Sequence, residues 1–383
     1  MSQINELIEK LCPNGVEWKT LGEVLKYEQP TKYIVESNDY SNEGTPVLTA
    51  GATFLLGYTE EINGIYTASK DNPVIIFDDF TTSFHWVDFD FKVKSSAMKM
   101  LKPINKKVNF RYVYYSMCEI KYIPVEHSRQ WIGTYSQFPI PLPPLEIQNR
   151  IVEILDHFTN LTANLTAELA LRRKQFEHFR EKLLSLDGVE GVEMKTLGEV
   201  CKKVTSGGTP NTKNPNYYNG DIPWLRTQEV DFADITDTGV KITNEGLENS
   251  SAKWIPSNCV IVAMYGATVG KVAINKIPLT TNQACCNLEI NEDIALYKFV
   301  YYCIENQYNY IKSLGQGCQT NINAQIVKQL QIPVPPLAVQ QSIVEQLDKF
   351  TVLIQNIENE LALRQKQYEY YREKLLSFPS PSL

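Results

Sequence analysis

The chain has 383 residues, enough for two or three domains with separate cores, and its composition of 43% hydrophobic and 21% charged residues is typical of a soluble globular protein. No apolar run reaches the ~18–20 residues of a membrane span, and neither a signal peptide nor a cysteine pattern for disulfides or zinc occurs, so we expect a cytoplasmic protein. The net charge of −7 argues mildly against a nucleic-acid binder that acts alone.

Charge is unevenly distributed in the first third of the chain. Residues 15–84 contain four basic and eleven acidic side chains, whereas residues 85–130 contain nine basic and four acidic ones. This distribution predicts one cationic patch on an otherwise acidic surface. Such a patch permits DNA binding but does not establish it.

After a short N-terminal helical stub, the first part of the chain is predicted to be a mixed α/β domain. Short strand-like segments occur at 46–51 (PVLTAG), 72–80 (NPVIIFDDF) and 89–94 (FDFKVK). Asp78 and Asp79 are adjacent on one of these segments and would face opposite sides of a strand. A structural role is therefore favoured over a metal site.

A proline-rich segment at 140–145 (IPLPPL) favours extended backbone before a helix can begin. Beyond it, apolar residues recur every three or four positions over five heptads, which is typical of a coiled coil. Arg172 interrupts this pattern, either as an arginine that reaches solvent or as a register or partner contact. A helix of about 37 residues would span roughly 55 Å, about one and a half turns of B-DNA.

The second half of the chain repeats the first. GVEWKTLGEV at 15–24 recurs as GVEMKTLGEV at 191–200, and 29 of the 46 residues from 140 to 185 recur identically 192 positions later. Such a repeat indicates a duplication and a pseudo-two-fold arrangement. We expect a first variable domain, a proline-rich lead-in with the first long helix, a second variable domain, and a second lead-in with its helix, over residues 1–137, 138–190, 191–329 and 330–383.

The two long helices are expected to pack antiparallel as a spacer between the variable domains, although dimerisation or tethering is an alternative. Arg364 interrupts the second helix at the position equivalent to Arg172. The predicted seam consists of Ile151, Leu155, Phe158, Leu165, Phe179, Ile343, Leu347, Phe350, Ile357 and Tyr371.

The second variable region has strand-like segments at 222–227, 258–266 and 271–275 and no catalytic motif. The segment GATVGKV within it departs from a phosphate-binding loop, because three rather than four residues separate its glycines and valine follows the lysine. The chain also lacks HExxH and the [DN]PP[YFW] motif of amino-methyltransferases. We expect no catalytic residue, no metal and no cofactor in this chain.

Both variable regions are rich in side chains that can contact DNA. Lysine and arginine neutralise phosphates, and arginine, glutamine and asparagine can form paired hydrogen bonds with bases. Any one of these side chains is more often a solvated surface residue than a DNA contact. The prediction therefore rests on how many of them occur in the two variable regions. The candidates are Gln29, Lys32, Lys92, Lys94, Lys99, Arg129, Gln130 and Trp131 in the first region, and Ser206, Thr209, Lys213, Arg226, Lys253, Lys271, Gln316, Gln319 and Asn321 in the second.

Over nearly its whole length the chain resembles the specificity subunits (HsdS) of type I restriction–modification systems. In the second half, SGGTPNTKNPNYYNGDIPWLRT, ITNEGLENSSAKWIP, GATVGK and IPVPPLAVQQSIVEQLDKF are similar to recurrent features of that family. In the first half, YEQPTKYIV, PVLTAG, IIFDDFTT and VDFDFKVKSSAMKM resemble one target-recognition-domain subtype of type IC members.

This resemblance implies that each variable region is a target-recognition domain for one half of a bipartite, asymmetric DNA site. It also implies that the helices set the gap between the half-sites. Two methyltransferase subunits (HsdM) would methylate adenine with S-adenosylmethionine, and restriction subunits (HsdR) would cleave with ATP and Mg²⁺. The chain itself would bind neither cofactor.

Two other classes of function remain open on the residues alone. An interaction scaffold would share the duplication and the coiled coil but would have no salt-dependent affinity for DNA. An enzyme would need motifs that are missing here. The specificity subunit of a related methylation system that is not type I is a closer alternative, because the difference would lie in the partners.

Overall fold

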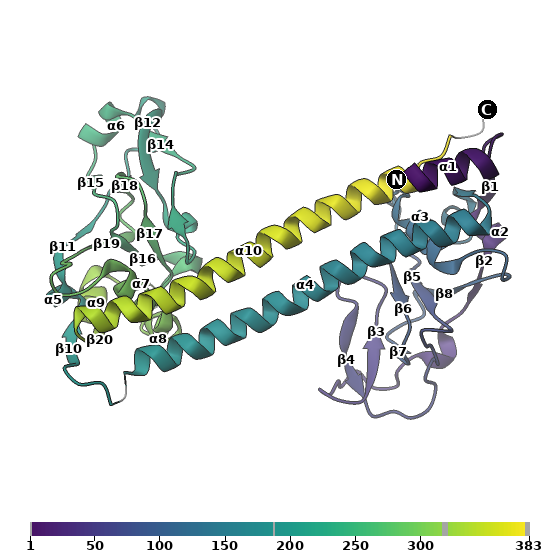
Figure 1. Ribbon diagram of the computed structural model, residues 1–383, viewed down its shortest axis with the longest axis horizontal. Helices are drawn as coiled ribbons and strands as arrows, with labels where there is room; N and C mark the ends of the chain where they lie inside the picture. The colour runs from purple at the N-terminus through teal and green to yellow at the C-terminus, as the bar shows by residue number, and fades with distance from the viewer. Residues whose placement is uncertain (1, 187, 316–320, 380–383) are drawn as a thin grey trace. The chain divides into compact units, whose positions relative to one another are not determined.

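The computed structural model describes residues 2–186, 188–315 and 321–379 and has a mixed α/β fold. The chain forms two compact units. Unit 1 combines residues 1–165 with 360–383, and unit 2 consists of residues 166–359. The long helices α4 (Leu145–Ser185) and α10 (Leu337–Leu376), drawn unbroken in Figure 1, therefore each contribute to both units, whereas the sequence placed each helix in a segment of its own.

Unit 1 begins with α1 (Ser2–Leu11) and contains sheets of four and three strands in addition to a two-stranded junction. The first is antiparallel with the strand order β2-β8-β5-β6, and the second has the order β4-β3-β7, in which β3 and β7 are parallel. These strands are β2 (Leu25–Glu28), β3 (Thr45–Leu48), β4 (Leu55–Thr59), β5 (Val74–Asp78), β6 (Phe84–Val87), β7 (Lys92–Val93) and β8 (Met98–Pro103). Helix α3 (Phe110–Cys118) and the short helix η2 (Tyr135–Gln137) follow.

Unit 2 has the same plan with additional elements. Its sheets have the orders β11-β19-β16-β17-β13 and β14-β12-β18-β15. The strands are β11 (Cys201–Ser206), β12 (Tyr218–Leu225), β13 (Asp234–Ile235), β14 (Lys241–Ile242), β15 (Trp254–Ile255), β16 (Val260–Ala263), β17 (Val272–Asn275), β18 (Leu279–Thr281) and β19 (Cys285–Ile290). The helices are α6 (Asn244–Glu248), α7 (Tyr297–Asn306), α8 (Tyr308–Ser313) and α9 (Ala324–Gln329), with the short helices η3 (Pro215–Tyr217), η4 (Thr227–Glu229) and η5 (Gly266–Thr268).

The repeated sequences form the same two-stranded junction in each unit. β1 (Glu17–Thr20) pairs antiparallel with β9 (Pro139–Leu142), and β10 (Glu193–Thr196) pairs in the same register with β20 (Gln331–Val334). The short helices α2 (Leu21–Val24) and α5 (Leu197–Val200) follow β1 and β10. Each begins with a Thr–Glu capping box, which satisfies backbone N–H groups at the helix start.

One residue distinguishes the two GVE(W/M)KTLGEV copies. Trp18 donates a hydrogen bond from Nε1 to the carbonyl oxygen of Pro379 at 3.2 Å, which places the segment after α10 against β1 within unit 1. Its counterpart in unit 2, Met194, is 60% exposed. The indole therefore makes a hydrogen bond that the methionine side chain, which has no N–H group, cannot make.

A fully buried strand lies at the centre of each unit. All the residues of 74–77 in β5 and of 260–263 in β16 have no exposed surface. They are continuous apolar runs, as expected for strands that are covered on both faces. The sequence predicted both as strands.

Four of the predicted seam residues form ring contacts between the long helices, and the others are buried or partly buried. In unit 1, Ile151 and Leu155 lie in one cluster with Leu375 and Leu376, and in unit 2, Ile343 and Leu347 lie in one cluster with Leu184. Leu165 is partly buried and Ile357 is buried. Each unit contains one aromatic stack between the helices, Phe158 on Tyr371 at 5.3 Å and Phe179 on Phe350 at 5.2 Å. The two stacks are three heptads apart along both helices.

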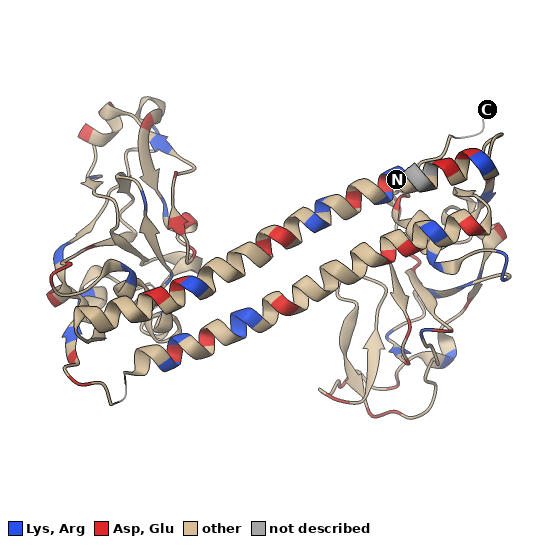
Figure 2. Ribbon diagram, viewed as in Figure 1, with Lys and Arg blue, Asp and Glu red and all other residues tan. Residues whose placement is uncertain are grey.

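The arginines that interrupt the seam are bound within their own helices. Arg172 donates to Gln175 and pairs with Glu168, and Arg364 does the same with Gln367 and Glu360. Both arginine side chains are about one-third exposed, as expected for arginines that reach solvent from the edge of an apolar stripe. Charged residues of both signs are interspersed along the helices (Figure 2).

No helix within the described residues combines the length and the apolar character that crossing a membrane requires.

We predict that Leu155→Ala and Leu347→Ala, at equivalent and fully buried positions, each lower the free energy of unfolding by about 2–5 kcal/mol. The loss arises because the smaller side chain leaves a cavity between the helix and its unit. Denaturant titration of the purified chain measures it. His157→Ala, at an exposed position of the same helix, is the control and should change stability by less than about 0.5 kcal/mol.

Candidate nucleic-acid interface

Three backbone hydrogen bonds bring the loops of unit 1 together at one end of its sheets. The N–H of Lys94 donates to the carbonyl of Leu48 at 3.1 Å, and the N–H of Asp79 donates to Ala97 at 2.9 Å. The carbonyl of Asp79 accepts from the N–H of Gln130 at 2.7 Å. We call the joined segments, residues 48–51, 79–83, 94–97 and 129–130, loop cluster 1.

Unit 2 contains the same three bonds between different residues. Asn282 donates to Leu225 at 2.9 Å, and Met264 donates to Ala284 at 2.8 Å and accepts from the N–H of Ile322 at 3.0 Å. The segments 225–228, 264–270, 282–284 and 321–322 form loop cluster 2. Two regions with little sequence similarity therefore share one main-chain framework, and their side chains differ on it.

Asp79 is the most constrained side chain of loop cluster 1. Its carboxylate is 1% exposed and lies 3.1 Å from the equally buried Lys99 ammonium and 3.5 Å from Arg129 Nη1. Its Oδ1 accepts the backbone N–H of Trp131 at 2.8 Å. The neighbouring Asp78 uses Oδ1 to accept the N–H groups of Phe80 and Thr81. Both carboxylates have structural roles, in agreement with the expectation for this pair.

Four of the residues predicted to contact DNA are buried, and we correct their assignment. Lys99 is neutralised by Asp79, and Trp131 packs in the core against Phe77 at a ring distance of 5.1 Å. Lys92 is 3% exposed and pairs with Glu61 at 2.7 Å, and this contact holds the pKa of the Glu61 carboxyl below its usual range.

Gln130, the fourth of these residues, accepts from the hydroxyl of Tyr122 at 2.8 Å and donates to the carbonyl of Ser128 at 2.9 Å. Sequence reasoning placed Lys92 and Lys99 at the surface because the carboxylates that pair with them, Glu61 and Asp79, are distant in sequence. For the same reason the charge of the stretch 85–130 overstates the positive charge available at the surface, because Lys92, Lys99 and Arg111 form ion pairs with carboxylates.

The other candidates of unit 1 lie at or near the surface. Arg129 has a side chain that is 51% exposed, and Lys94 is partly exposed with its ammonium bonded to Asn38. Gln29 and Lys32 are exposed, but Lys32 pairs with Glu28 at 2.8 Å. Arg129 and Lys94 belong to loop cluster 1, whereas Gln29 and Lys32 lie on a different segment.

In unit 2, tight backbone packing gathers several candidates around Gly207 and Gly208. A Cβ on Gly207 would lie 1.7 Å from the carbonyl oxygen of Thr281, and one on Gly208 would lie 2.5 Å from the backbone of Ser251. Only glycine permits these approaches. These approaches place the segment that contains the two glycines beside the end of β18. The hydroxyl of Thr209 in this segment donates to Gln283 of loop cluster 2.

The remaining candidates of unit 2 have mixed environments. Ser206 is partly buried and Lys213 and Lys253 are exposed; Arg226 and Lys271 are partly exposed and lie near Glu229 and Asp231 respectively, the latter pair at 2.6 Å. Asn321 accepts from the N–H of Gly266 at 3.3 Å. Gln316 and Gln319 lie outside the described residues.

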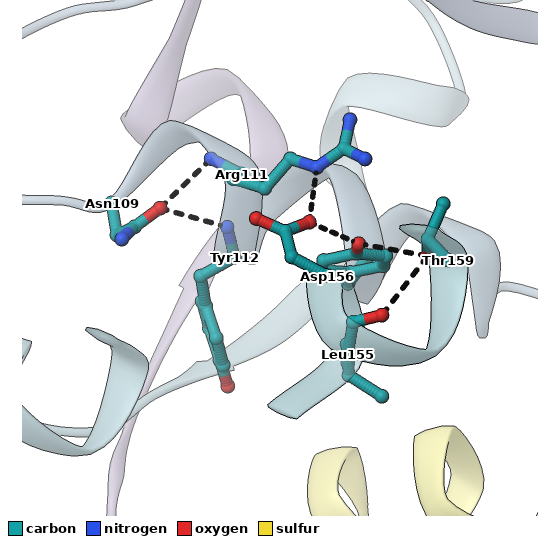
Figure 3. A network of polar contacts seen from close by, with 7 residues as sticks. Asn109, Arg111, Tyr112, Leu155, Asp156 and Thr159 are labelled. Carbon is teal, nitrogen blue, oxygen red and sulfur yellow. Dashed lines mark hydrogen bonds and ion pairs between the residues drawn. The ribbon is translucent and has the colours of Figure 1, made fainter. Parts of the chain in front are cut away.

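A polar network attaches each variable region to its long helix, and Figure 3 shows the one in unit 1. Asp156 of α4 accepts from Arg111 Nε of α3 at 2.9 Å and from the hydroxyl of Tyr115, which also contacts Thr159. Asn109 caps α3 by accepting the N–H groups of Arg111 and Tyr112. Burial raises the pKa of the Tyr115 hydroxyl, so it remains a proton donor over the physiological range.

The network recurs in unit 2 with one substitution. Asp348 of α10 accepts from the hydroxyl of Tyr302 at 2.7 Å and from Lys298, where unit 1 has arginine, at 2.5 Å. The hydroxyl of Tyr302 lies 3.3 Å from Thr351. We refer to the two networks as the helix anchors. Sequence reasoning missed the helix anchors. The similarity between RYVYYSM (111–117) and KFVYYCI (298–304), together with the aspartate and threonine that recur in the two long helices, could have indicated them.

The C-terminal part of each long helix is also bonded to a variable region. Arg372 of α10 binds Glu119 in unit 1, and Arg180 of α4 pairs with Glu305 in unit 2 at 3.1 Å. The two arginines occupy equivalent positions of the repeat. Each variable region is thus bonded to both helices within its unit.

Among the described residues, no group of three or more His, Cys, Asp or Glu side chains is arranged to hold a metal ion. The loop clusters offer hydrogen-bond donors, acceptors and cations, and the chemistry they support is recognition of a polar, anionic surface.

Comparison with known proteins identifies the family. The sequence model described as "Type I restriction modification DNA specificity domain" matches residues 13–171 and 189–363, once in each half of the chain. The chain belongs to this family. The two matches contain the two variable regions, so each half of the duplication is one specificity domain.

Individual relatives support the same assignment. The specificity subunit of the type I restriction enzyme EcoR124I/EcoR124II from Escherichia coli is 45% identical over 404 aligned positions, which cover 100% of this chain and 99% of the relative. A putative type I restriction enzyme specificity subunit from Haemophilus influenzae, S.HindORF215P, is 31% identical, with 99% and 100% covered.

Solved structures share the fold at low sequence identity. The S subunit of a type I restriction–modification system from M. genitalium gives a TM-score of 0.65 at 16% identity, covering 96% of this chain and 98% of that one. A second structure, from work on complex assembly and conformational transition of the type I R-M system, gives 0.54 at 17% identity, covering 95% and 98%.

We predict that Lys99→Met lowers the free energy of unfolding by about 3–5 kcal/mol, because it removes the buried countercharge of the Asp79 carboxylate and leaves it with the half-exposed Arg129. Adding Asp79→Asn should restore most of the loss, since the neutral amide can still accept the N–H of Trp131. Denaturant titration of both variants measures the effect. Lys94→Met is the matched control at a partly exposed lysine. A Lys99→Met variant as stable as the parent chain would contradict a stabilising role for the ion pair.

Proposed function

We propose that this chain reads a bipartite, asymmetric DNA site for a type I restriction–modification complex, with one half-site for each unit. The supporting observation is the shared framework of loop clusters 1 and 2. Because the same main-chain bonds hold different side chains, the two units can approach DNA in the same way and select different bases. A site with two unlike halves follows from this arrangement.

The long helices support a fixed gap between the half-sites. Helices of 41 and 40 residues have lengths of about 60 Å, and buried contacts hold the part of each helix that lies within each unit. The helix anchors join each variable region rigidly to its own helix. In this proposal the helices are a spacer rather than a surface for dimerisation of whole chains.

Catalysis is assigned to partner subunits. The similarity to the Escherichia coli relative, a specificity subunit of a type I restriction enzyme, supports this division of labour. Two methyltransferase subunits (HsdM) would carry S-adenosylmethionine and methylate adenine, and restriction subunits (HsdR) would use ATP and Mg²⁺. This chain would be non-catalytic, bind double-stranded DNA and neither cofactor, and act in the cytoplasm where its target lies.

The decisive experiment is to coexpress the chain with its methyltransferase partner in a host without adenine methylation and to map methyladenine across the genome. We expect one split motif with a fixed gap, methylated once on each strand. Absence of methylation, with the partner shown to be folded and bound, would favour a scaffold without DNA affinity. Restriction of unmethylated phage separates a type I system from a related system without a translocating nuclease.

The spacer role predicts the effect of lengthening both helices. Inserting one heptad into each helix between the two aromatic stacks keeps the seam in register and adds about 10 Å. We expect the gap to grow by up to about three base pairs, at ~3.4 Å each, while both half-sites stay unchanged. The same methylation map measures it. Replacing one heptad by another of equal length controls for the altered sequence, and an unchanged gap in the longer variant would exclude the spacer role.

A further inference from the structure

Arg129 and Asn321 occupy the same position on the shared loop framework. Each directly precedes the residue whose N–H donates to the central carbonyl, Gln130 to Asp79 in unit 1 and Ile322 to Met264 in unit 2. Each also lies ten residues before the strand that leads into a long helix, β9 or β20. The positional match does not depend on sequence similarity, since the segments differ.

Both side chains are held from one side. The Arg129 guanidinium lies 3.5 Å from Asp79 Oδ2 and 6.0 Å from the centre of the Phe80 ring, yet half of the side chain is exposed. Asn321 accepts from Gly266 N–H through Oδ1 and is partly exposed. A polar group that protein contacts already orient on one side, and that is exposed to solvent on the other, loses little conformational entropy when it binds a partner.

The two groups match different bases. A guanidinium presents two parallel N–H donors, which fit O6 and N7 of guanine. A carboxamide presents one donor and one acceptor, which fit N7 and the N6 amino group of adenine. The oxygen of Asn321 retains a second lone pair for this purpose beside its bond to Gly266.

We propose that Arg129 and Asn321 are corresponding base-reading residues, Arg129 for a guanine in one half-site and Asn321 for an adenine in the other. The inference rests on the proposed function and assigns specificity within it. Because the same kind of methyltransferase subunit would act on both halves, the two bases lie at the same distance from the methylated adenine of their own half-site.

Asp79 and Lys99 are positioning residues for Arg129. The carboxylate orients the guanidinium, and Lys99 neutralises the carboxylate, so that no net negative charge lies behind the group that meets DNA. The corresponding positions in unit 2 are Met264 and Cys286, which are uncharged and buried. The ion pair therefore occurs in the unit whose reading residue is arginine and not in the unit where it is asparagine.

The test is the methylation map of the complex with single substitutions. Arg129→Ala should abolish the preference for guanine at one position of one half-site, by roughly 5- to 150-fold, and leave the other half-site unchanged. Asn321→Ala should do the same for adenine in the other half. Lys121→Ala and Lys312→Ala, at exposed lysines outside the loop clusters, should leave the motif intact.

Arg129→Lys separates base reading from phosphate contact, because lysine keeps the charge and loses the paired donors. Loss of guanine selectivity in this variant supports the proposal, and it also serves if Arg129→Ala does not fold. A motif that survives Arg129→Lys unchanged, a uniform loss across all sequences, or affected bases at unequal distances from the methylated adenines overturns it. If the parent chain itself yields no split motif, the proposed function fails instead.

Discussion

Two carboxylates, Asp156 and Asp348, determine how each variable region meets its long helix. Each accepts from a tyrosine and a cation of the same short helix, α3 or α7, and that helix packs on the sheet that presents the loops. Charge-assisted bonds of this kind are directional and stronger than neutral ones, especially when partly buried. A rotation of the sheet relative to its helix would break several of them at once, so the loops are presented at a defined angle.

The loops themselves depend on main-chain bonds. Asp79 and Met264 differ in the charge and polarity of their side chains, yet their backbone N–H and C=O groups make the same contacts. A framework of this kind tolerates unlike side chains because the backbone provides the bonds. Extra elements in unit 2, such as the glycine turn at Gly207 and Gly208, add to the framework without changing it. Shared geometry with divergent chemistry is what a reader of two unlike half-sites requires.

Much of the fold could be predicted from the sequence, and the reasons are local. Proline before a helical apolar period locates both long helices, although at 41 and 40 residues they are slightly longer than predicted, and continuous apolar runs locate β5 and β16. The site was predicted less well because burial of a lysine depends on a distant partner: Lys92 needs Glu61, and Lys99 needs Asp79. Arg129 and Asn321 were nominated singly, but their correspondence is visible only in the hydrogen bonds.

The main-chain framework has a consequence for how such a protein changes over generations. A loop side chain can be replaced without removing a bond that holds the loops, so new specificities arise without loss of a folded chain. In the proposed complex, methylation and cleavage both take their target from this one subunit, and a single substitution would redirect them together. The genome would then carry unprotected copies of the new site until methylation had covered them. The barrier to a new specificity therefore lies in whether methylation of the new sites precedes their cleavage, and not in the folding of this chain.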